Sequence, residues 1–280
     1  MRARGSHTIQ WRLLTMAGPG ALVLAFFFFA PLIVVSAAAF EKGGAGLRRT
    51  FSDPLFWQGL EGSFALALGA GTISLLVGSA VAFRLARMSK GRQTALLFFI
   101  SLPLTFSGLI VAYGFILAFG RAGFVTLSLA TVGVNPAWFG GLIYSTEGLA
   151  FAYCYYLVPR VVLLMLPVLA NFDHQQLLAA GSLGASRWRA LVDVLVPEVL
   201  PTAVVAFCLV AAVAFGAYGT ALALVGTQLN ILPLLLYTKV SAVTSDFPAA
   251  AALSLVLLAV CTSFLWVGEA YAAHKSRQRG

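Results

Sequence analysis

The stretch NFDHQQLLAAGSLGASRWRALVDVLVP, from Asn171 to Pro197, separates two long apolar runs and is unlike an ordinary connecting loop. Its centre is rich in small residues, namely Ala179, Ala180, Gly184, Ala185 and Ser186. Small residues let another protein approach the backbone closely, and Leu183 and Trp188 offer apolar anchors beside the charged Arg187 and Arg189. An amphipathic helix lying on a membrane surface fits the same residues. On composition alone, both interpretations stand.

The chain around this stretch is strongly apolar. Of its 280 residues, 60 % are hydrophobic and only 10 % are charged, and the mean hydropathy is +0.94. Soluble domains carry about 25 % charged residues, because a surface in water needs them. The net charge of +9 does not indicate nucleic-acid binding, since the basic residues fall in short gaps between apolar runs. We therefore expect an all-α integral membrane protein that is embedded in the lipid bilayer.

A helix needs about 20 apolar residues to cross a bilayer. Six segments meet this requirement, at residues 16–40, 63–83, 95–119, 148–170, 202–225 and 248–270. The first resembles a signal peptide, but its apolar core from Met16 to Val35 is too long for one, which favours an uncleaved helix. The predicted organisation is an N-terminal tail, first helix and outer loop (residues 1–60, with the loop at Glu41–Gly62), a membrane core (residues 61–271) and a basic tail (residues 272–280).

Lysine and arginine in short loops concentrate on the cytoplasmic side of membrane proteins. With the N-terminus inside, the cytoplasmic segments hold Arg2, Arg4, Arg12, Arg84, Arg87, Lys90, Arg92, Arg187, Arg189, Lys275, Arg277 and Arg279. The outer segments hold only Lys42, Arg48, Arg49, Arg121 and Lys239, and Arg160 lies inside a span. This bias predicts a multi-pass protein of the inner (plasma) membrane with both termini in the cytoplasm.

The sequence gives no sign of catalysis. A phosphate-binding loop needs a Gly-Lys pair, but the lysines follow Glu41, Ser89, Thr238 and His274. The three histidines lie far apart, the acidic residues are scattered singly, and Cys154, Cys208 and Cys261 sit in apolar runs without metal-ligand spacing. We expect no enzyme activity, metal or cofactor in this chain.

The spacing within the central stretch resembles the EAA loop of binding-protein-dependent ABC importer permeases of the type I fold. That pattern is Glu-Ala-Ala, three residues, Gly, nine residues, Ile-x-Leu-Pro. Ala179, Ala180, Gly184 and Pro197 fall in register with it, within a predicted coupling loop at residues 171–200. Leu178 stands where the family has glutamate, which helps to dock the ATPase.

The likeness extends from about Phe56 to Tyr271. Residues 83–87 (FRLAR) resemble the family's second-span ending, residues 101–104 (SLPL) its third-span proline motif, and residues 246–251 (DFPAAA) the start of its last span. These last features are similar to those of the spermidine/putrescine branch, which is close to the iron, thiamine and aminoethylphosphonate permeases. The resemblance thus implies a small polar or charged solute, either polyamine-like or a phosphonate or other small anion.

The resemblance also implies partners. Separate ATPase subunits, which hold ATP and magnesium, would dock on a coupling helix at about residues 180–188, with contacts from Ala179, Ala180, Gly184, Ala185, Ser186, Arg187, Trp188 and Pro197. A second permease chain, identical or homologous, would complete the pathway, and a periplasmic or lipoprotein solute-binding protein would deliver solute. The alternative is a secondary transporter or channel without an ATPase, which predicts inverted repeats and carboxylates within the membrane.

Polar groups inside spans are candidates for the solute pathway, because each needs a partner or water there. They are Ser107, Tyr113, Tyr153, Tyr156, Arg160 and Tyr218. Helix packing or an interfacial position explains each tyrosine equally well. Arg160 either pairs with a carboxylate or reaches the surface along its flexible stem, or it meets an anionic group of the solute.

Overall fold

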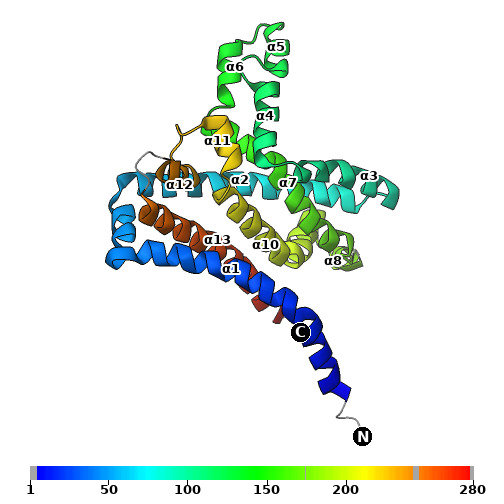
Figure 1. Ribbon diagram of the computed structural model, residues 1–280. Helices are drawn as coiled ribbons and strands as arrows, with labels where there is room; N and C mark the ends of the chain where they lie inside the picture. Colours follow the sequence, from blue (N-terminus) through cyan, green and yellow to red (C-terminus); the bar gives the residue numbers. More distant parts are fainter. Residues whose placement is uncertain (1–4, 174, 242–245, 278–280) are drawn as a thin grey trace. The chain divides into compact units, whose positions relative to one another are not determined.

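The computed structural model describes residues 5–173, 175–241 and 246–277, and every regular element in these ranges is a helix (Figure 1). Arg2, Arg4, His174 and Arg279, which entered the arguments above, lie outside the described residues. Helices are expected because backbone polar groups in lipid must be satisfied within their own segment. The described ranges contain six helical stretches that can span a membrane, as predicted: Gly18–Glu41, Pro54–Ala86, Gly108–Ala130, Thr146–Ala170, Arg187–Phe215 and Phe247–Lys275.

The chain forms two compact units, one of residues 1–53 with 239–256 and one of residues 54–238 with 257–280. The first unit contains α1 (Gly5–Ser52), the end of α12 (Leu232–Ser241) and the start of α13 (Phe247–Arg277). Ala39, Ala251 and Ala252 form its small core, and Arg49 pairs with Asp246 at 2.9 Å.

The segment predicted as an outer loop, Glu41–Gly62, is mostly helical, because α1 continues to Ser52 and α2 begins at Pro54. The chain turns inside α1 at Gly43 and Gly44, whose φ angles of 71° and 78° lie in the left-handed region that glycine adopts freely. Lys239 and Asp53 pair at 3.0 Å beyond this turn. The polar residues thus belong to helices and ion pairs.

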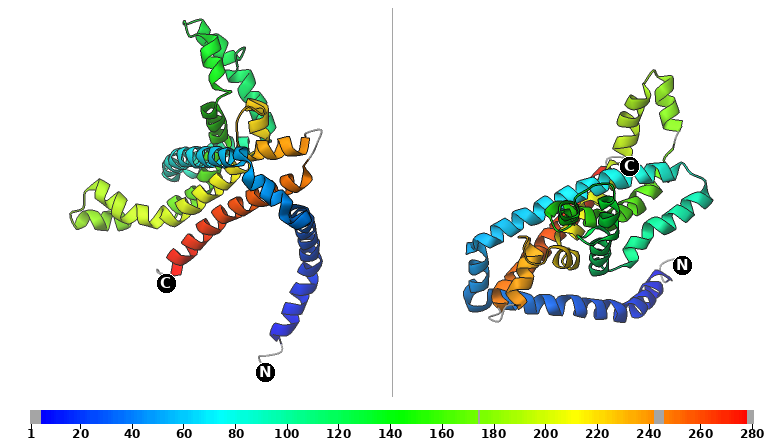
Figure 2. Two further views of the ribbon diagram at one scale, coloured as in Figure 1. Left: turned by 90° about the vertical axis from the view of Figure 1, so that its left-hand side faces the viewer. Right: turned by 90° about the horizontal axis from the view of Figure 1, so that it is seen from above.

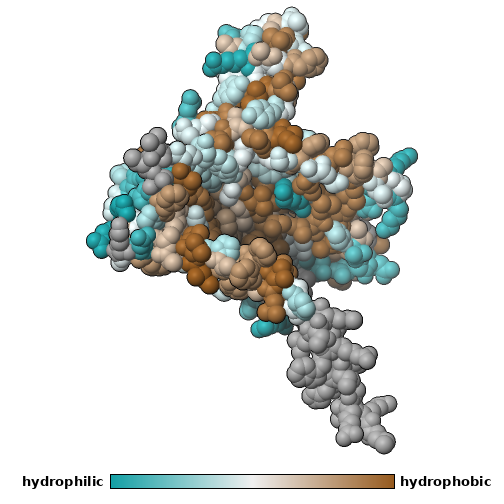
Figure 3. Space-filling model, viewed as in Figure 1, coloured by the Kyte–Doolittle hydropathy of each residue, from teal (hydrophilic) through white to brown (hydrophobic). Residues whose placement is uncertain are grey.

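The second unit is built around α2 (Pro54–Ala86), α7 (Thr146–Ala170) and α10 (Val196–Phe215), which pack against one another. Small residues on α2 permit this close packing, as membrane helix interfaces require. A methyl group added at Gly78 would come within 2.6 Å of the Val161 side chain. Leu149, Tyr153 and Phe215 fill the core. Outside it, apolar side chains cover much of the visible face (Figure 3).

The third span differs from the predicted continuous helix at residues 95–119. The structure has α3 (Lys90–Ser101), a short 3-10 helix η1 (Leu102–Thr105) and a separate α4 (Gly108–Phe119). Pro103 lies in η1, and Ser107 begins α4 by accepting a hydrogen bond from the Ile110 N–H at 3.4 Å. An apolar window does not reveal this break, because the sequence within residues 95–119 stays apolar on both sides of it.

Helices α4, α5 (Phe124–Ala130) and α6 (Pro136–Leu142) project away from α2, α7 and α10 within the second unit (Figures 1 and 2). The predicted fifth span at residues 202–225 is also interrupted. α10 ends at Phe215, and α11 (Gly219–Val225) begins after the break at Gly216. These two interruptions bring the start of α4 next to the start of α11, where the Thr220 hydroxyl donates to the Gly108 carbonyl at 3.1 Å.

Candidate coupling segment and solute pathway

The stretch predicted to couple to an ATPase folds as two short helices. α8 (Gln175–Ser182) begins after Asp173, whose Oδ1 accepts from the Gln175 N–H at 2.9 Å. α9 (Arg187–Ala190) runs into a π-helical turn, η2 (Leu191–Leu195), and then into α10. The expected single helix at residues 180–188 is therefore wrong, and the segment is a helix–turn–helix.

Gly184 is the residue that produces the turn. Its φ of +85° is left-handed, the Ala185 N–H donates to the Ala180 carbonyl at 3.0 Å, and the Gly184 N–H donates to the Gly181 carbonyl at 3.0 Å. This pair of bonds is the Schellman motif that ends a helix at a glycine. Ser186 then caps α9 by accepting from the Arg189 N–H at 3.3 Å. The family spacing of alanines and glycine thus corresponds to a helix end.

The turn presents large apolar side chains outward. Leu183 is 90 % exposed, Trp188 is 77 % exposed and Leu178 is 72 % exposed. Arg187 is also exposed, and Arg189 pairs with Asp193 at 3.4 Å. Exposed apolar residues grouped on a rigid turn mark a surface for a partner or a membrane. Pro197 lies apart from this surface, in the first turn of α10, where its missing N–H is tolerated.

Four of the predicted pathway residues do not come together. Ser107 caps α4, and Tyr113 is exposed on the same helix. Tyr153 is fully buried and its hydroxyl donates to the Ala217 carbonyl at 2.7 Å. Tyr218 lies against Tyr237 with ring centroids 5.5 Å apart. These contacts give Ser107, Tyr153 and Tyr218 structural roles in helix capping and packing.

Tyr156 and Arg160 do share a cavity. They are one turn apart on α7, and they line a space of about 220 Å³ together with Gly108 and Thr220. Sequence reasoning missed Gly108 and Thr220, because they come from α4 and α11 and no local pattern links them to α7. Their only signal is that each stands at the start of a helix that follows a break.

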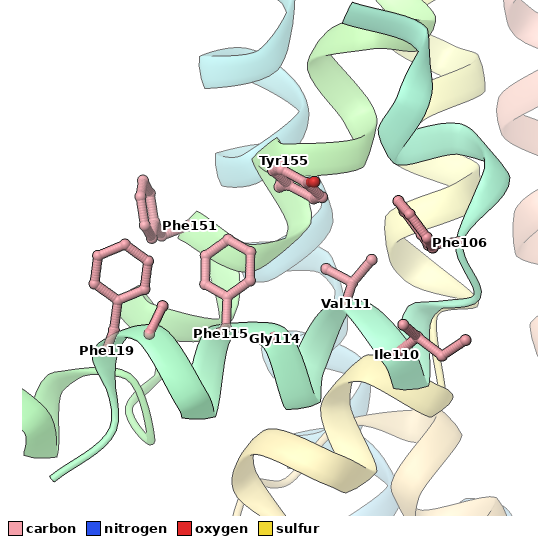
Figure 4. A pocket seen from close by; sticks show the side chains of 9 residues that line it. Phe106, Ile110, Val111, Gly114, Phe115, Phe119, Phe151 and Tyr155 are labelled. Atoms are coloured by element: carbon pink, nitrogen blue, oxygen red, sulfur yellow. The ribbon is translucent and has the colours of Figure 1, made fainter. Parts of the chain in front are cut away.

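A second, apolar pocket of about 470 Å³ lies between α4 and α7 (Figure 4). Phe115 contacts Phe119, Phe151 and Tyr155 there at ring-centroid distances of 5.5–5.6 Å. Phe106 borders both this pocket and the polar cavity. The aromatic lining suits apolar groups and offers little to hold a charged solute.

A third space of about 600 Å³ is lined by Arg121, Tyr144, Gln228 and the chain around Gly226. The sequence prediction treated Arg121 only as an outer-loop charge. It is a second cation at a cavity, outside the helices that form the core of the unit.

The family model for binding-protein-dependent transport system inner membrane components matches residues 74–277. The chain belongs to this family. The match covers α7, the coupling segment and α10, so the chain is an ABC importer permease subunit of the type I fold. Such a subunit is a non-catalytic, multi-pass component of the inner membrane.

Several curated permeases are similar over most of the chain. Sulfate permease 2, chloroplastic, of Chlamydomonas reinhardtii is 25 % identical over 98 % of this chain and 74 % of its own length. The sulfate transport system permease protein CysW of Escherichia coli K12 is 25 % identical over 93 % of this chain and 88 % of its own. The putative 2-aminoethylphosphonate transport system permease protein PhnU of Salmonella typhimurium LT2 is 29 % identical, covering 89 % and 86 %.

Solved structures show the same fold. A chain of a bacterial alginate ABC transporter, in complex with its alginate pentasaccharide-bound periplasmic protein, superposes with a TM-score of 0.72 at 17 % identity, covering 99 % of this permease and 98 % of that chain. A second alginate-importer structure gives a TM-score of 0.74 at 16 % identity. At this identity the likeness concerns the fold.

Proposed function

We propose that this permease subunit imports a small anion and is driven by a separate ATPase that docks on residues 179–188. The observation that carries the proposal is the turn between α8 and α9, which projects Leu183 and Trp188 outward. Its Ala-Ala and Gly residues match the family's coupling loop, and Gly184 fixes its shape. A rigid, apolar and exposed turn suits insertion into a groove of another protein better than adsorption to a flexible surface.

In the proposed cycle, this chain forms the solute pathway and transmits the motion of the ATPase to it. ATP binding closes the ATPase subunits, which move the docked turn, and the motion passes through η2 into α10. Coupling of this kind needs packed elements with two arrangements. α10 packs against α2 and α7, and the polar cavity lies at its far end, near Ala217. ATP and magnesium belong to the partner.

The absence of the family's glutamate changes the chemistry of docking. Leu178 occupies that position and is 72 % exposed. A leucine offers an apolar contact where a glutamate offers an ion pair or a hydrogen bond. We therefore expect docking to depend on Leu178, Leu183 and Trp188 as apolar anchors and to weaken little at high salt.

The solute class rests on Arg160 and on the relatives. Three relatives are named as sulfate or 2-aminoethylphosphonate permeases, and a polyamine solute finds no support among them. A fixed cation within a span repels a polyamine and attracts an anion. The remaining partners in the proposal are a second permease chain, identical or homologous, and a periplasmic or lipoprotein solute-binding protein. A secondary transporter or channel also draws no support from these relatives.

Gly184→Glu tests the proposal in the assembled complex. A non-glycine residue at a left-handed φ costs about 1–2 kcal/mol, and an unpaired carboxylate in an apolar interface costs several kcal/mol more. We expect solute-stimulated ATP hydrolysis to fall at least about tenfold with an unchanged amount of permease in the membrane. Gly91→Glu is the matched control, because Gly91 is exposed in α3 with open space around it. Normal stimulated hydrolysis in the Gly184 variant refutes the docking site.

A further inference from the structure

We propose that the cavity where α4, α7 and α11 meet is an oxyanion-binding site within the permease itself. The cavity has a volume of about 220 Å³, enough for a tetrahedral group such as a sulfate or phosphonate, and Arg160 lies on its wall. The inference rests on the proposed function, because it names the class of solute that the pathway takes. It goes further by assigning the contacts to Arg160, Tyr156 and the start of α4.

Arg160 supplies a cation with unused donors. Its Nη1 donates to the Tyr156 carbonyl at 2.6 Å, which fixes the guanidinium against its own helix, 5.4 Å from the Tyr156 ring centroid. A guanidinium has five N–H donors, so this bond leaves most of them available. Among the described residues, no carboxylate pairs with Arg160 and none lines its cavity. The charge is therefore held in place inside a span, and no counter-ion for it lies among the residues that the structure describes.

Tyr156 supplies a second donor at the same cavity. Its side chain is only 8 % exposed, and its hydroxyl is buried without a hydrogen-bond partner among the described residues. The neighbouring Thr220 hydroxyl, which also lines the cavity, donates to the Gly108 carbonyl at 3.1 Å. Leaving a buried hydroxyl unpaired is unfavourable. An oxygen of a bound anion can accept a hydrogen bond from the Tyr156 hydroxyl.

The start of α4 adds a third favourable feature. Gly108 is the first residue of this helix of 12 residues and lines the cavity. The first backbone N–H groups of a helix lack partners within it and carry a partial positive charge. The glycine lets Thr220 pack closely against this helix end, because a side chain at position 108 would collide with the Thr220 hydroxyl. The guanidinium and the helix start both favour an anion, and the phenol on the same helix as the guanidinium can donate to it.

The test is direct binding of radiolabelled sulfate to the permease complex in nanodiscs, without the solute-binding protein and at constant ionic strength. We expect Arg160→Gln to weaken sulfate binding about 10- to 100-fold, because hydrogen bonds to charged groups are the stronger class. Arg160→Lys should fall between, and Tyr156→Phe should weaken binding about fivefold. Arg121→Gln is the matched control, since Arg121 lines a different cavity. 2-Aminoethylphosphonate should compete with sulfate, and spermidine should not.

The inference is overturned if the wild-type complex binds neither anion, if Arg160→Gln binds as the wild type does, or if Arg121→Gln loses as much affinity. ATP hydrolysis measured on the same preparations separates the two proposals. A complex that carries an ATPase but binds sulfate independently of Arg160 refutes the cavity and leaves the importer intact. A complex that binds sulfate through Arg160 but carries no ATPase refutes the ATP-driven importer and leaves the cavity assignment intact.

Discussion

The Ala185 N–H donates to the Ala180 carbonyl at 3.0 Å, across a glycine whose φ is +85°. This bond ends α8 and turns the chain so that α9 can begin at Arg187, capped by Ser186. The small residues of the coupling loop are thus needed for the turn itself, in addition to any approach by a partner. A rigid turn transmits displacement, and a flexible loop would absorb it.

Tyr153 and Tyr156 lie on the same helix and should respond oppositely to loss of the hydroxyl. Tyr153→Phe removes the buried bond to the Ala217 carbonyl and leaves that carbonyl unpaired, at a cost of about 1–3 kcal/mol. Tyr156→Phe removes a hydroxyl that has no partner among the described residues, so stability should stay constant or rise. Thermal unfolding of the solubilised permease measures both. A larger loss in Tyr156→Phe than in Tyr153→Phe contradicts the assignment.

Gly78 should be essential for packing of α2 against α7. Because a methyl group there meets the Val161 side chain at 2.6–2.7 Å, Gly78→Ala should destabilise the permease by about 1–3 kcal/mol. Gly69→Ala on the same helix meets nothing within 4 Å, and it should be neutral or stabilising by up to about 1 kcal/mol. Denaturation in mixed micelles gives both values. Equal effects of the two substitutions would refute this helix contact.

Trp188 should matter for association and little for folding. Its side chain is 77 % exposed, so Trp188→Ala should change permease stability by no more than about 0.5 kcal/mol. The same substitution should weaken ATPase binding by about 2 kcal/mol or more, because it removes a central aromatic anchor. Trp266→Ala is the control, since Trp266 is 71 % exposed but lies on α13 within the last span. Co-purification with graded salt and detergent compares the two, and equal ATPase retention counts against docking at the turn.

The charge bias predicts where each loop lies. On a background lacking Cys154, Cys208 and Cys261, an impermeant thiol reagent added to intact cells should label Gly141→Cys, between the third and fourth spans. It should not label Gly91→Cys or Ser276→Cys. Both glycines have open space around them, so access to the reagent decides the result. Labelling of Ser276→Cys from outside would contradict this topology, because the C-terminus would then lie outside the cell and the coupling turn would lie on the side away from the ATPase.

The sequence was sufficient for what depends on composition and local spacing. Six apolar stretches predicted six candidate spans. The sequence predicted a helix at residues 180–188, but Ala180 and Gly184 form the end of one. The breaks at Pro103 and Gly216 were missed, because a proline or glycine in an apolar run is compatible with both a kinked span and two helices. Neighbouring helices decide between them, and sequence spacing does not describe those neighbours.

The candidate pathway shows the same limit. Tyr156 and Arg160 are four residues apart on one helix, so their sharing a face could be predicted. Thr220 lies 60 positions from Arg160 and Gly108 lies 52; only the packing of the second unit brings them to the same cavity. Tyr153 is closer to Arg160 in sequence than Thr220 or Gly108 is, but its buried hydroxyl donates to the Ala217 carbonyl.

Cross-linking from position 183 tests the central claim most directly. Leu183 is 90 % exposed at the tip of the turn, so p-benzoylphenylalanine placed there should leave the permease fold unchanged. In a complex that transports, ultraviolet irradiation should join position 183 to a nucleotide-binding subunit, and a probe at Leu265 on α13 should not. The account predicts that ATP changes the yield at position 183, because the turn moves with the ATPase. A transporting complex in which position 183 reacts only with lipid contradicts it.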